Sequence, residues 1–217
     1  MGQEIFTGAL LPGADGPPIG FEEAVTVRLD TLLPQDAGTG AVTPEAFDVY
    51  LNTMLAMVSR AQLPLSVIAL AVDSSPITTF PGVCDFGFIG RAMARCVRQE
   101  TRPQDVVGVV SETSGNGTPR FVIACPLLSE IQAAALGERM RDAMTASASE
   151  WESPWLTISV GVAAFTLDTP DSAALLNRAQ SALLRAQRQG GNRVWRHSET
   201  AQRLDSRSET GDFAGEN

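Results

Sequence analysis

The chain has 217 residues, 44% of them hydrophobic and 19% charged, so it can bury one sizeable core in a single globular domain. Its net charge of −9 excludes a broad nucleic-acid-binding face, because phosphate binding requires a basic surface. No run of about 18 apolar residues occurs and the N-terminus has no basic start, so we expect a cytoplasmic protein without direct membrane insertion.

The sequence offers few side chains for metal or disulfide chemistry. Its three cysteines, Cys84, Cys96 and Cys125, are widely spaced, and His197 is the single histidine. Neither a disulfide framework nor a zinc site is expected from this set. The chain also contains no lysine, so an anion would have to be bound by arginine side chains or backbone amides.

The first elements are indicated by turn residues and apolar runs. Residues 1–36 are rich in Gly and Pro and predict a linker or docking segment. Pro44 then opens a helix, with Thr43 as its N-cap. Leu65–Val72 is a continuous apolar run, which predicts a central strand buried on both faces. In the next helix the predicted apolar face includes Phe88, and the predicted solvated face carries Arg91, Arg95 and Arg98.

The second half of the chain predicts a hairpin, two helices and two strands. The hairpin strands are residues 106–110 and 120–125, joined by a turn rich in Ser, Gly, Asn and Pro. Ser129 caps the following helix, whose predicted inward face includes Ile131 and Ala135. An alternating strand at 156–163, a helix that starts at Thr169 and Pro170 and a short strand at 193–196 follow. Residues 198–217 predict a disordered acidic tail.

The order of these elements defines the expected fold. It predicts an α/β (α+β) fold with a ferredoxin-like βαββαβ core and a central, mostly antiparallel sheet flanked by helices. Right-handed connections further predict that the hairpin lies between the other strands, with the helices on one side.

Several short patterns resemble the GGDEF domain, the diguanylate cyclase family, over residues 36–195. Asp36 stands before a Thr-Gly pair and an Ala-Phe pair as in the family's opening pattern, and residues 159–162 match its Ser-x-Gly-x strand. Residues 190–194 match the end of its last helix and strand. The resemblance implies a GGDEF-like domain at residues 37–197 and a bacterial signalling protein.

The resemblance also implies that the catalytic groups are missing. The family joins two GTP molecules into cyclic di-GMP, and carboxylates hold the divalent metal ions of such phosphoryl-transfer reactions. The family's first metal-binding Asp falls on Ala71, which leaves Asp73 alone. Its signature turn falls on Gly117, Thr118, Pro119, Arg120 and Phe121, so both acids are replaced. We therefore expect a degenerate pseudoenzyme with no catalytic residue, no metal and no cofactor.

A motif that the resemblance retains is the family's product-binding inhibitory site, an Arg-x-x-Asp before the hairpin. Arg102 and Asp105 match it, and either Arg139 or Arg141 is the counterpart of a third arginine in the following helix. Arginine can bond guanine O6 and N7 and stack on the base, and aspartate can accept from guanine N–H groups. Cyclic di-GMP is thus the expected ligand, and Arg102→Ala is expected to abolish its binding without unfolding the domain.

Two functions remain open on the sequence. The first is a regulatory domain that binds cyclic di-GMP and controls a signalling or export assembly. The second is a ligand-free scaffold for protein interaction or homodimerisation, since an Arg-x-x-Asp pair can also be an ordinary loop salt bridge. Both expect a protein partner or a homodimer, and neither involves nucleic acid.

Overall fold

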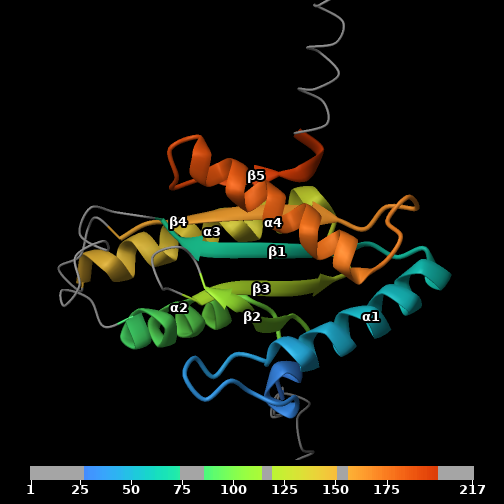
Figure 1. Ribbon diagram of the computed structural model, residues 1–217, viewed down its shortest axis with the longest axis horizontal. Coiled ribbons are helices and arrows are strands. Elements are labelled where there is room, and N and C mark those ends of the chain that lie inside the picture. Colours follow the sequence, from blue (N-terminus) through green and yellow to red (C-terminus); the bar gives the residue numbers. More distant parts are fainter. Residues whose placement is uncertain (1–26, 74–85, 114–118, 151–155, 200–217) are drawn as a thin grey trace, which may run out of the picture.

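The computed structural model describes residues 27–73, 86–113, 119–150 and 156–199. They form one sheet in the strand order β2-β3-β1-β4-β5, with helices on both faces (Figure 1). The elements in chain order are η2 (Leu29–Leu32), α1 (Pro44–Ala61), β1 (Leu65–Val72), α2 (Phe86–Glu100), β2 (Val106–Thr113), β3 (Pro119–Pro126), α3 (Glu130–Glu150), β4 (Ile158–Ala164), α4 (Ser172–Arg188) and β5 (Val194–Arg196). Among these residues, no helix is long and apolar enough to cross a membrane.

The sheet is antiparallel except at one edge. The central strand β1 pairs antiparallel with β3 and β4, and β5 pairs parallel with β4. This confirms the predicted βαββαβ core and its mostly antiparallel sheet. The predicted place of the hairpin is wrong, because β3 pairs with β1 and leaves β2 at the edge.

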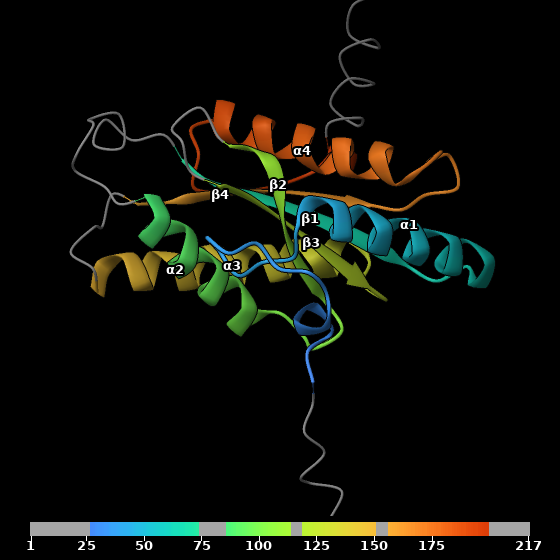
Figure 2. The ribbon, with the colours of Figure 1, turned by 60° about the horizontal axis from the view of Figure 1, so that its bottom comes forward.

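The helices cover both faces of the sheet, two on each (Figure 2). Ile68 and Leu70 of β1 pack in the cluster that includes α2 and α3, whereas Val67 and Ala69 pack in the cluster that includes α1 and α4. The expectation of helices on one side is therefore wrong. All eight residues of β1 are buried, and a strand that is apolar on both faces requires cover on each.

Local capping explains where the helices begin and end. The Thr43 hydroxyl accepts from the Ala46 N–H at 3.4 Å, which confirms the predicted start of α1. Helix α4 begins after Asp171, not at Thr169, because the Asp171 carboxylate accepts from the Ala174 N–H at 2.7 Å. The predicted stop at Gly190 is confirmed by its φ of 108°, a left-handed conformation that suits glycine.

Close packing of α4 on the sheet depends on Gly161 of β4. A Cβ atom at this position would lie 2.1 Å from the backbone nitrogen of Leu183 and 2.3 Å from the carbonyl oxygen of Ala179. Only a residue without a side chain allows the helix backbone to approach the strand so closely.

The predicted faces of α2 and α3 are partly wrong. Phe88 is 48% exposed and Ile131 is 69% exposed, and Ala135 is also on the surface. The buried stripe of α3 is instead Ala133, Leu136, Met140, Met144 and Ala148. Because these residues are three or four positions apart, they turn Ile131 and Ala135 outward.

The N-terminal segment that the structure describes packs against the end of α2. The Arg28 guanidinium donates to the carbonyl oxygens of Arg98 at 3.0 Å and Thr101 at 3.1 Å. The fully buried Asp30 accepts from Nε of Arg28 at 3.2 Å and Nε of Arg98 at 3.1 Å. Arg98 was expected on a solvated face, but it belongs to this Asp30 cluster of Arg28, Asp30 and Arg98. Through it, residues 28–30 hold the end of α2.

Candidate ligand site

The two residues of the predicted Arg-x-x-Asp motif, Arg102 and Asp105, bond to each other just after the end of α2. The Arg102 backbone N–H donates to Asp105 Oδ2 at 2.8 Å, and its Nη2 donates to Asp105 Oδ1 at 2.8 Å. Nη2 also donates to the carbonyl oxygen of Pro126 at 2.8 Å. The Asp105 side chain is fully buried, and the Arg102 side chain is 36% exposed. Asp105 therefore orients Arg102 and is itself covered from solvent.

Electrostatics reinforce this arrangement. The hydrogen bonds that the Arg102 side chain donates to the Asp105 carboxylate raise the pKa of Arg102, so the guanidinium stays charged over the whole physiological range. Among the described residues, the side-chain bonds of Arg102 use Nε and Nη2, and Nη1 donates none. The exposed side of this cation thus keeps donors for an incoming acceptor.

The backbone of the motif is held by two further elements. The Leu29 N–H donates to the carbonyl oxygen of Pro103 at 2.9 Å, which ties the loop to η2. The Tyr50 hydroxyl of α1 lies 3.5 Å from the carbonyl oxygen of Gln104. Burial and the nearby Asp105 carboxylate raise the pKa of Tyr50 to about 12, so this hydroxyl remains protonated. The loop that carries Arg102 is therefore fixed from several sides.

A hollow of about 360 Å³ opens beside Arg102, between the end of α2 and α3. We call it the Arg102 hollow, and its lining residues are Gln99, Glu100, Thr101, Arg102, Leu128, Gln132, Ala135, Leu136 and Arg139. It brings together two of the predicted ligand-binding residues, Arg102 and Arg139. Leucine side chains, two glutamine amides and two cations give the mixed apolar and polar lining that is common in ligand sites.

Arg139 is paired within the hollow. Its Nε and Nη2 donate to Glu100 Oε2 at 3.1 Å and 2.9 Å, and Nη2 also donates to the Glu100 carbonyl oxygen at 3.0 Å. The Arg139 side chain is nevertheless 63% exposed and that of Glu100 is 26% exposed. The pair is therefore open to solvent and to competing ions.

Arg141, the other predicted counterpart, lies elsewhere. Its Nε donates to Glu138 Oε2 at 2.8 Å, and its Nη1 donates to Asn192 Oδ1 at 3.2 Å, next to the start of β5. A further ion pair joins Arg141 to Asp142 at 2.8 Å. The structure thus brings Arg139, and not Arg141, to the same hollow as Arg102.

The other predicted end, where the family has its catalytic groups, is built around Asp73. Asp73 Oδ1 accepts from the Ser159 hydroxyl at 2.6 Å. Its Oδ2 accepts from the Thr157 hydroxyl and from the Asn192 N–H, both at 2.8 Å. Both carboxylate oxygens are therefore occupied by neutral donors, in a position that links β1, β4 and the start of β5. Among the described residues, no group of three His, Cys, Asp or Glu side chains could hold a metal ion.

Part of the predicted signature turn falls on β3. Pro119, Arg120 and Phe121 are its first three residues, while Gly117 and Thr118 lie outside the described residues. Phe121 is fully buried and pairs with Leu70 of β1 and Val109 of β2. Phe121, the predicted counterpart of the family's aromatic residue, therefore packs in the core of the sheet and follows Pro119 and Arg120 in β3.

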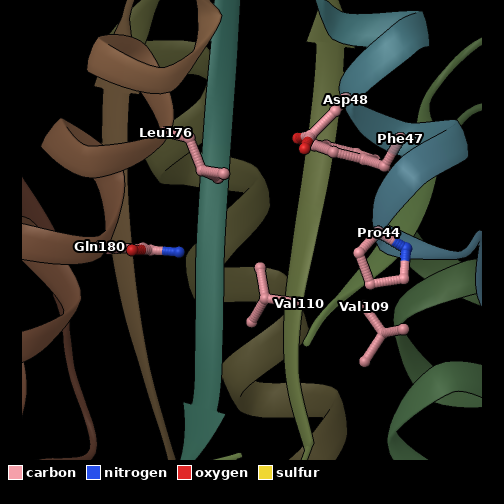
Figure 3. A pocket seen from close by; sticks show the side chains of 7 residues that line it. All are labelled: Pro44, Phe47, Asp48, Val109, Val110, Leu176 and Gln180. Atoms are coloured by element: carbon pink, nitrogen blue, oxygen red, sulfur yellow. The ribbon is translucent and has the colours of Figure 1, made fainter. Parts of the chain in front are cut away.

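A second hollow of about 200 Å³ lies on the opposite face of the sheet (Figure 3). Its lining residues come from α1, β2 and α4, namely Pro44, Phe47, Asp48, Val109, Val110, Leu176 and Gln180. Asp48, beside Phe47 on α1, and Gln180 on α4 are its polar side chains, and the rest of the lining is apolar (Figure 3). A carboxylate without a cation among these lining residues does not suit an anionic ligand.

Of the residues that line the Arg102 hollow, sequence reasoning predicted only Arg102 and Arg139, and Glu100 and Gln132 are among those it missed. Glu100 stands two positions before Arg102, yet its partner Arg139 is 39 residues away and no local pattern joins them. Gln132 was not predicted as a lining residue, although its side chain caps α3 by accepting from the Ser129 N–H at 3.0 Å. The capping pattern of Ser129 followed by Gln132 was the available signal that this residue lies at the start of α3.

Comparisons with known proteins agree with this fold. Residues 91–193 match the family model described as "Diguanylate cyclase, GGDEF domain". No curated protein sequence matches the chain. Residues 91–193 are therefore similar to this family, and the architecture described above agrees with that likeness.

Three solved structures illustrate the likeness. The GGDEF domain of DgcB from Caulobacter crescentus, solved with c-di-GMP, has a TM-score of 0.62 at 19% identity, covering 75% of this chain and 92% of that one. The active GGEEF domain of a diguanylate cyclase from Vibrio cholerae has a TM-score of 0.60 at 20% identity, and the match covers 69% of this chain and 93% of that one. Diguanylate cyclase SiaD from Pseudomonas aeruginosa, solved with its activator SiaC, has a TM-score of 0.61 at 22% identity, and the match covers 75% of this chain and 61% of that one. At these identities the likeness is one of fold.

Proposed function

We propose that this chain is a catalytically inactive GGDEF domain that binds cyclic di-GMP in the Arg102 hollow and thereby controls a signalling or export assembly. The observation that carries the proposal is the meeting of Arg102 and Arg139 in one hollow at the position of the family's inhibitory motif. That the DgcB domain was solved with c-di-GMP supports the choice of ligand.

The chemistry of the hollow suits a cyclic dinucleotide. The exposed side of Arg102 can donate to guanine O6 and N7 and can stack on the base. Arg139 can bind a phosphodiester, because a guanidinium donates two parallel hydrogen bonds to such a group. Leu128 and Leu136 offer apolar surface under the bases. Asp105 acts indirectly, since it is buried and orients Arg102 without reaching the ligand.

Catalytic inactivity is proposed from the residues at the other end of the sheet. Ala71 cannot coordinate a metal ion, and Pro119 and Arg120 replace the two acids of the signature turn. Asp73 bonds to three neutral donors of the fold, so a metal ion would have to compete with them. An arginine at the turn would also repel a divalent cation.

A scaffold function is the second candidate. Val49 and Met57 of α1 are 68% and 58% exposed, and large apolar side chains on one helix favour a protein contact. In either case we place the domain at residues 37–197 in the cytoplasm, with a protein partner or a second copy. Within segments 1–36 and 198–217, Arg28 and Asp30 pack against the end of α2 and Ser198 bonds to Glu130, so the proposed docking elements are the parts of these segments beyond those contacts.

Calorimetric titration and a turnover assay test the proposal together. We expect the purified chain to bind cyclic di-GMP, and to form no cyclic di-GMP when it is incubated with GTP and Mg²⁺. Formation of product from GTP would contradict the inactive assignment. Absence of any heat with cyclic di-GMP, in a sample shown to be folded, would contradict the receptor and leave the scaffold.

A further inference from the structure

The Arg102 hollow already contains an anion of the protein itself. Glu100 occupies two of the guanidinium nitrogens of Arg139, at 3.1 Å and 2.9 Å. A phosphodiester bound by two parallel hydrogen bonds must use Nη2 together with either Nε or Nη1, and Nη2 already donates to Glu100, so the ligand and Glu100 compete for this nitrogen. The contact between Glu100 and Arg139 is thus present before any ligand binds.

The two arginines of the hollow differ in how firmly their partners are held. Asp105 is fully buried and bonds to Arg102 through both the backbone and the side chain, so this pair persists. Glu100 is partly exposed and sits at the last position of α2, where its side chain can turn into solvent. An exposed ion pair of this kind is weak, because water solvates both charges well.

We propose that Glu100 is an intramolecular competitor that sets the affinity and selectivity of the hollow. The inference rests on the proposed function of cyclic di-GMP binding. A ligand displaces Glu100 from Arg139 and must then tolerate its negative charge nearby. The hollow therefore favours ligands that contact both Arg102 and Arg139. It discriminates against small anions that can contact only one of these two arginines.

The backbone contact of Arg139 allows a clean test. Arg139 Nη2 also donates to the carbonyl oxygen of Glu100 at 3.0 Å, and this bond survives any change of the side chain. Glu100→Gln therefore removes the competing charge and keeps both the side-chain shape and the position of Arg139. Glu138→Gln is the matched control, because Glu138 makes a similar exposed ion pair with Arg141 outside the hollow.

Titration of these variants with cyclic di-GMP measures the competition. We expect Glu100→Gln to bind roughly threefold to tenfold more tightly than the unchanged chain, and Glu138→Gln to bind as the unchanged chain does. Equal affinity of Glu100→Gln and the unchanged chain would overturn the inference and leave the proposed function intact. No binding by any of the three proteins would overturn both.

A double-variant cycle separates competition from general repulsion. If Glu100 acts by occupying Arg139, its substitution should gain little affinity in an Arg139→Ala background, where the contested donors are gone. A gain of the same size in both backgrounds would show a long-range charge effect and would contradict the competition.

Discussion

The two ends of the sheet use their charged residues in different ways. At the Asp73 end, both oxygens of one carboxylate are bonded to Thr157, Ser159 and the backbone of Asn192. At the Arg102 end, a buried carboxylate holds one arginine, and a second arginine on the opposite helix remains open to solvent. A charge whose bonding capacity is used inside the fold supports structure, whereas a charge that keeps exposed donors is available to a ligand.

The strongest test of this contrast is the removal of Arg102. Because Asp105 is fully buried, Arg102→Ala should leave an unpaired carboxylate in the core and lower the free energy of unfolding by about 3 kcal/mol. The sequence alone predicts that Arg102→Ala leaves the domain folded and stable, but the burial of Asp105 predicts a loss of stability. Denaturant unfolding measures the loss.

Its control is Arg102→Ala combined with Asp105→Ala. The double variant removes the buried charge together with its partner and should be more stable than the single variant. A single variant at least as stable as the double one would show that Asp105 does not depend on Arg102.

A somewhat smaller loss is expected at the Asp30 cluster. Asp30→Ala removes a fully buried acceptor from two arginines that are themselves partly exposed, so we expect a loss of about 2 kcal/mol in the free energy of unfolding. Hydrogen exchange should also accelerate at the backbone amides of Thr101 and Arg102, in the loop that this segment holds. Asp142→Ala, at an exposed ion pair of α3, is the control and should change neither quantity.

Substitution of Asp73 tests the structural role that we assign to the other end of the sheet. Asp73→Asn keeps the shape but replaces one acceptor oxygen with an NH2 donor, so at least one of the three hydrogen bonds is lost and the free energy of unfolding falls by about 1 kcal/mol. The affinity for cyclic di-GMP should not change, since the residue lies outside the Arg102 hollow. A change in affinity without a change in stability would reverse the roles assigned to the two ends.

The smallest expected effect is the titration of His197. Burial lowers its pKa in the folded chain below the ordinary value of 6.5. The unfolded chain therefore binds the proton first, and this residue destabilises the fold as the pH drops below 6.5. Thermal unfolding across this range should be less pH-dependent in His197→Asn, and an identical profile would exclude a contribution from His197.

Much of the fold could be predicted because its signals are local. The apolar run of β1, the Thr43 cap and Gly190 each act within a few residues, and the structure has all three as expected. The distribution of the helices over the two faces of the sheet could not be predicted from local signals, because it depends on long-range packing of the helices against the strands. Ile131 shows this, since its spacing fits a helix but not the buried stripe that α3 actually uses.

The candidate site was predictable only in part for the same reason. Arg102 and Asp105 lie three positions apart, so their contact follows from a local motif. The pairing of Glu100 with Arg139, and of Asp30 with Arg98, joins segments far apart in the chain. Such contacts are decided by tertiary packing, and a single sequence carries no pattern for them.

The most direct test of the central claim compares two arginines of the same helix. Arg139 lies in the Arg102 hollow, and Arg141, two positions further on, contacts Glu138 and Asn192 outside it. In calorimetric titrations with cyclic di-GMP, Arg139→Ala should bind at least about tenfold more weakly than the unchanged chain, the loss expected for a charged hydrogen bond. Arg141→Ala should bind normally. Equal affinities for the two variants, or a loss at Arg141 alone, would contradict the Arg102 hollow as the site.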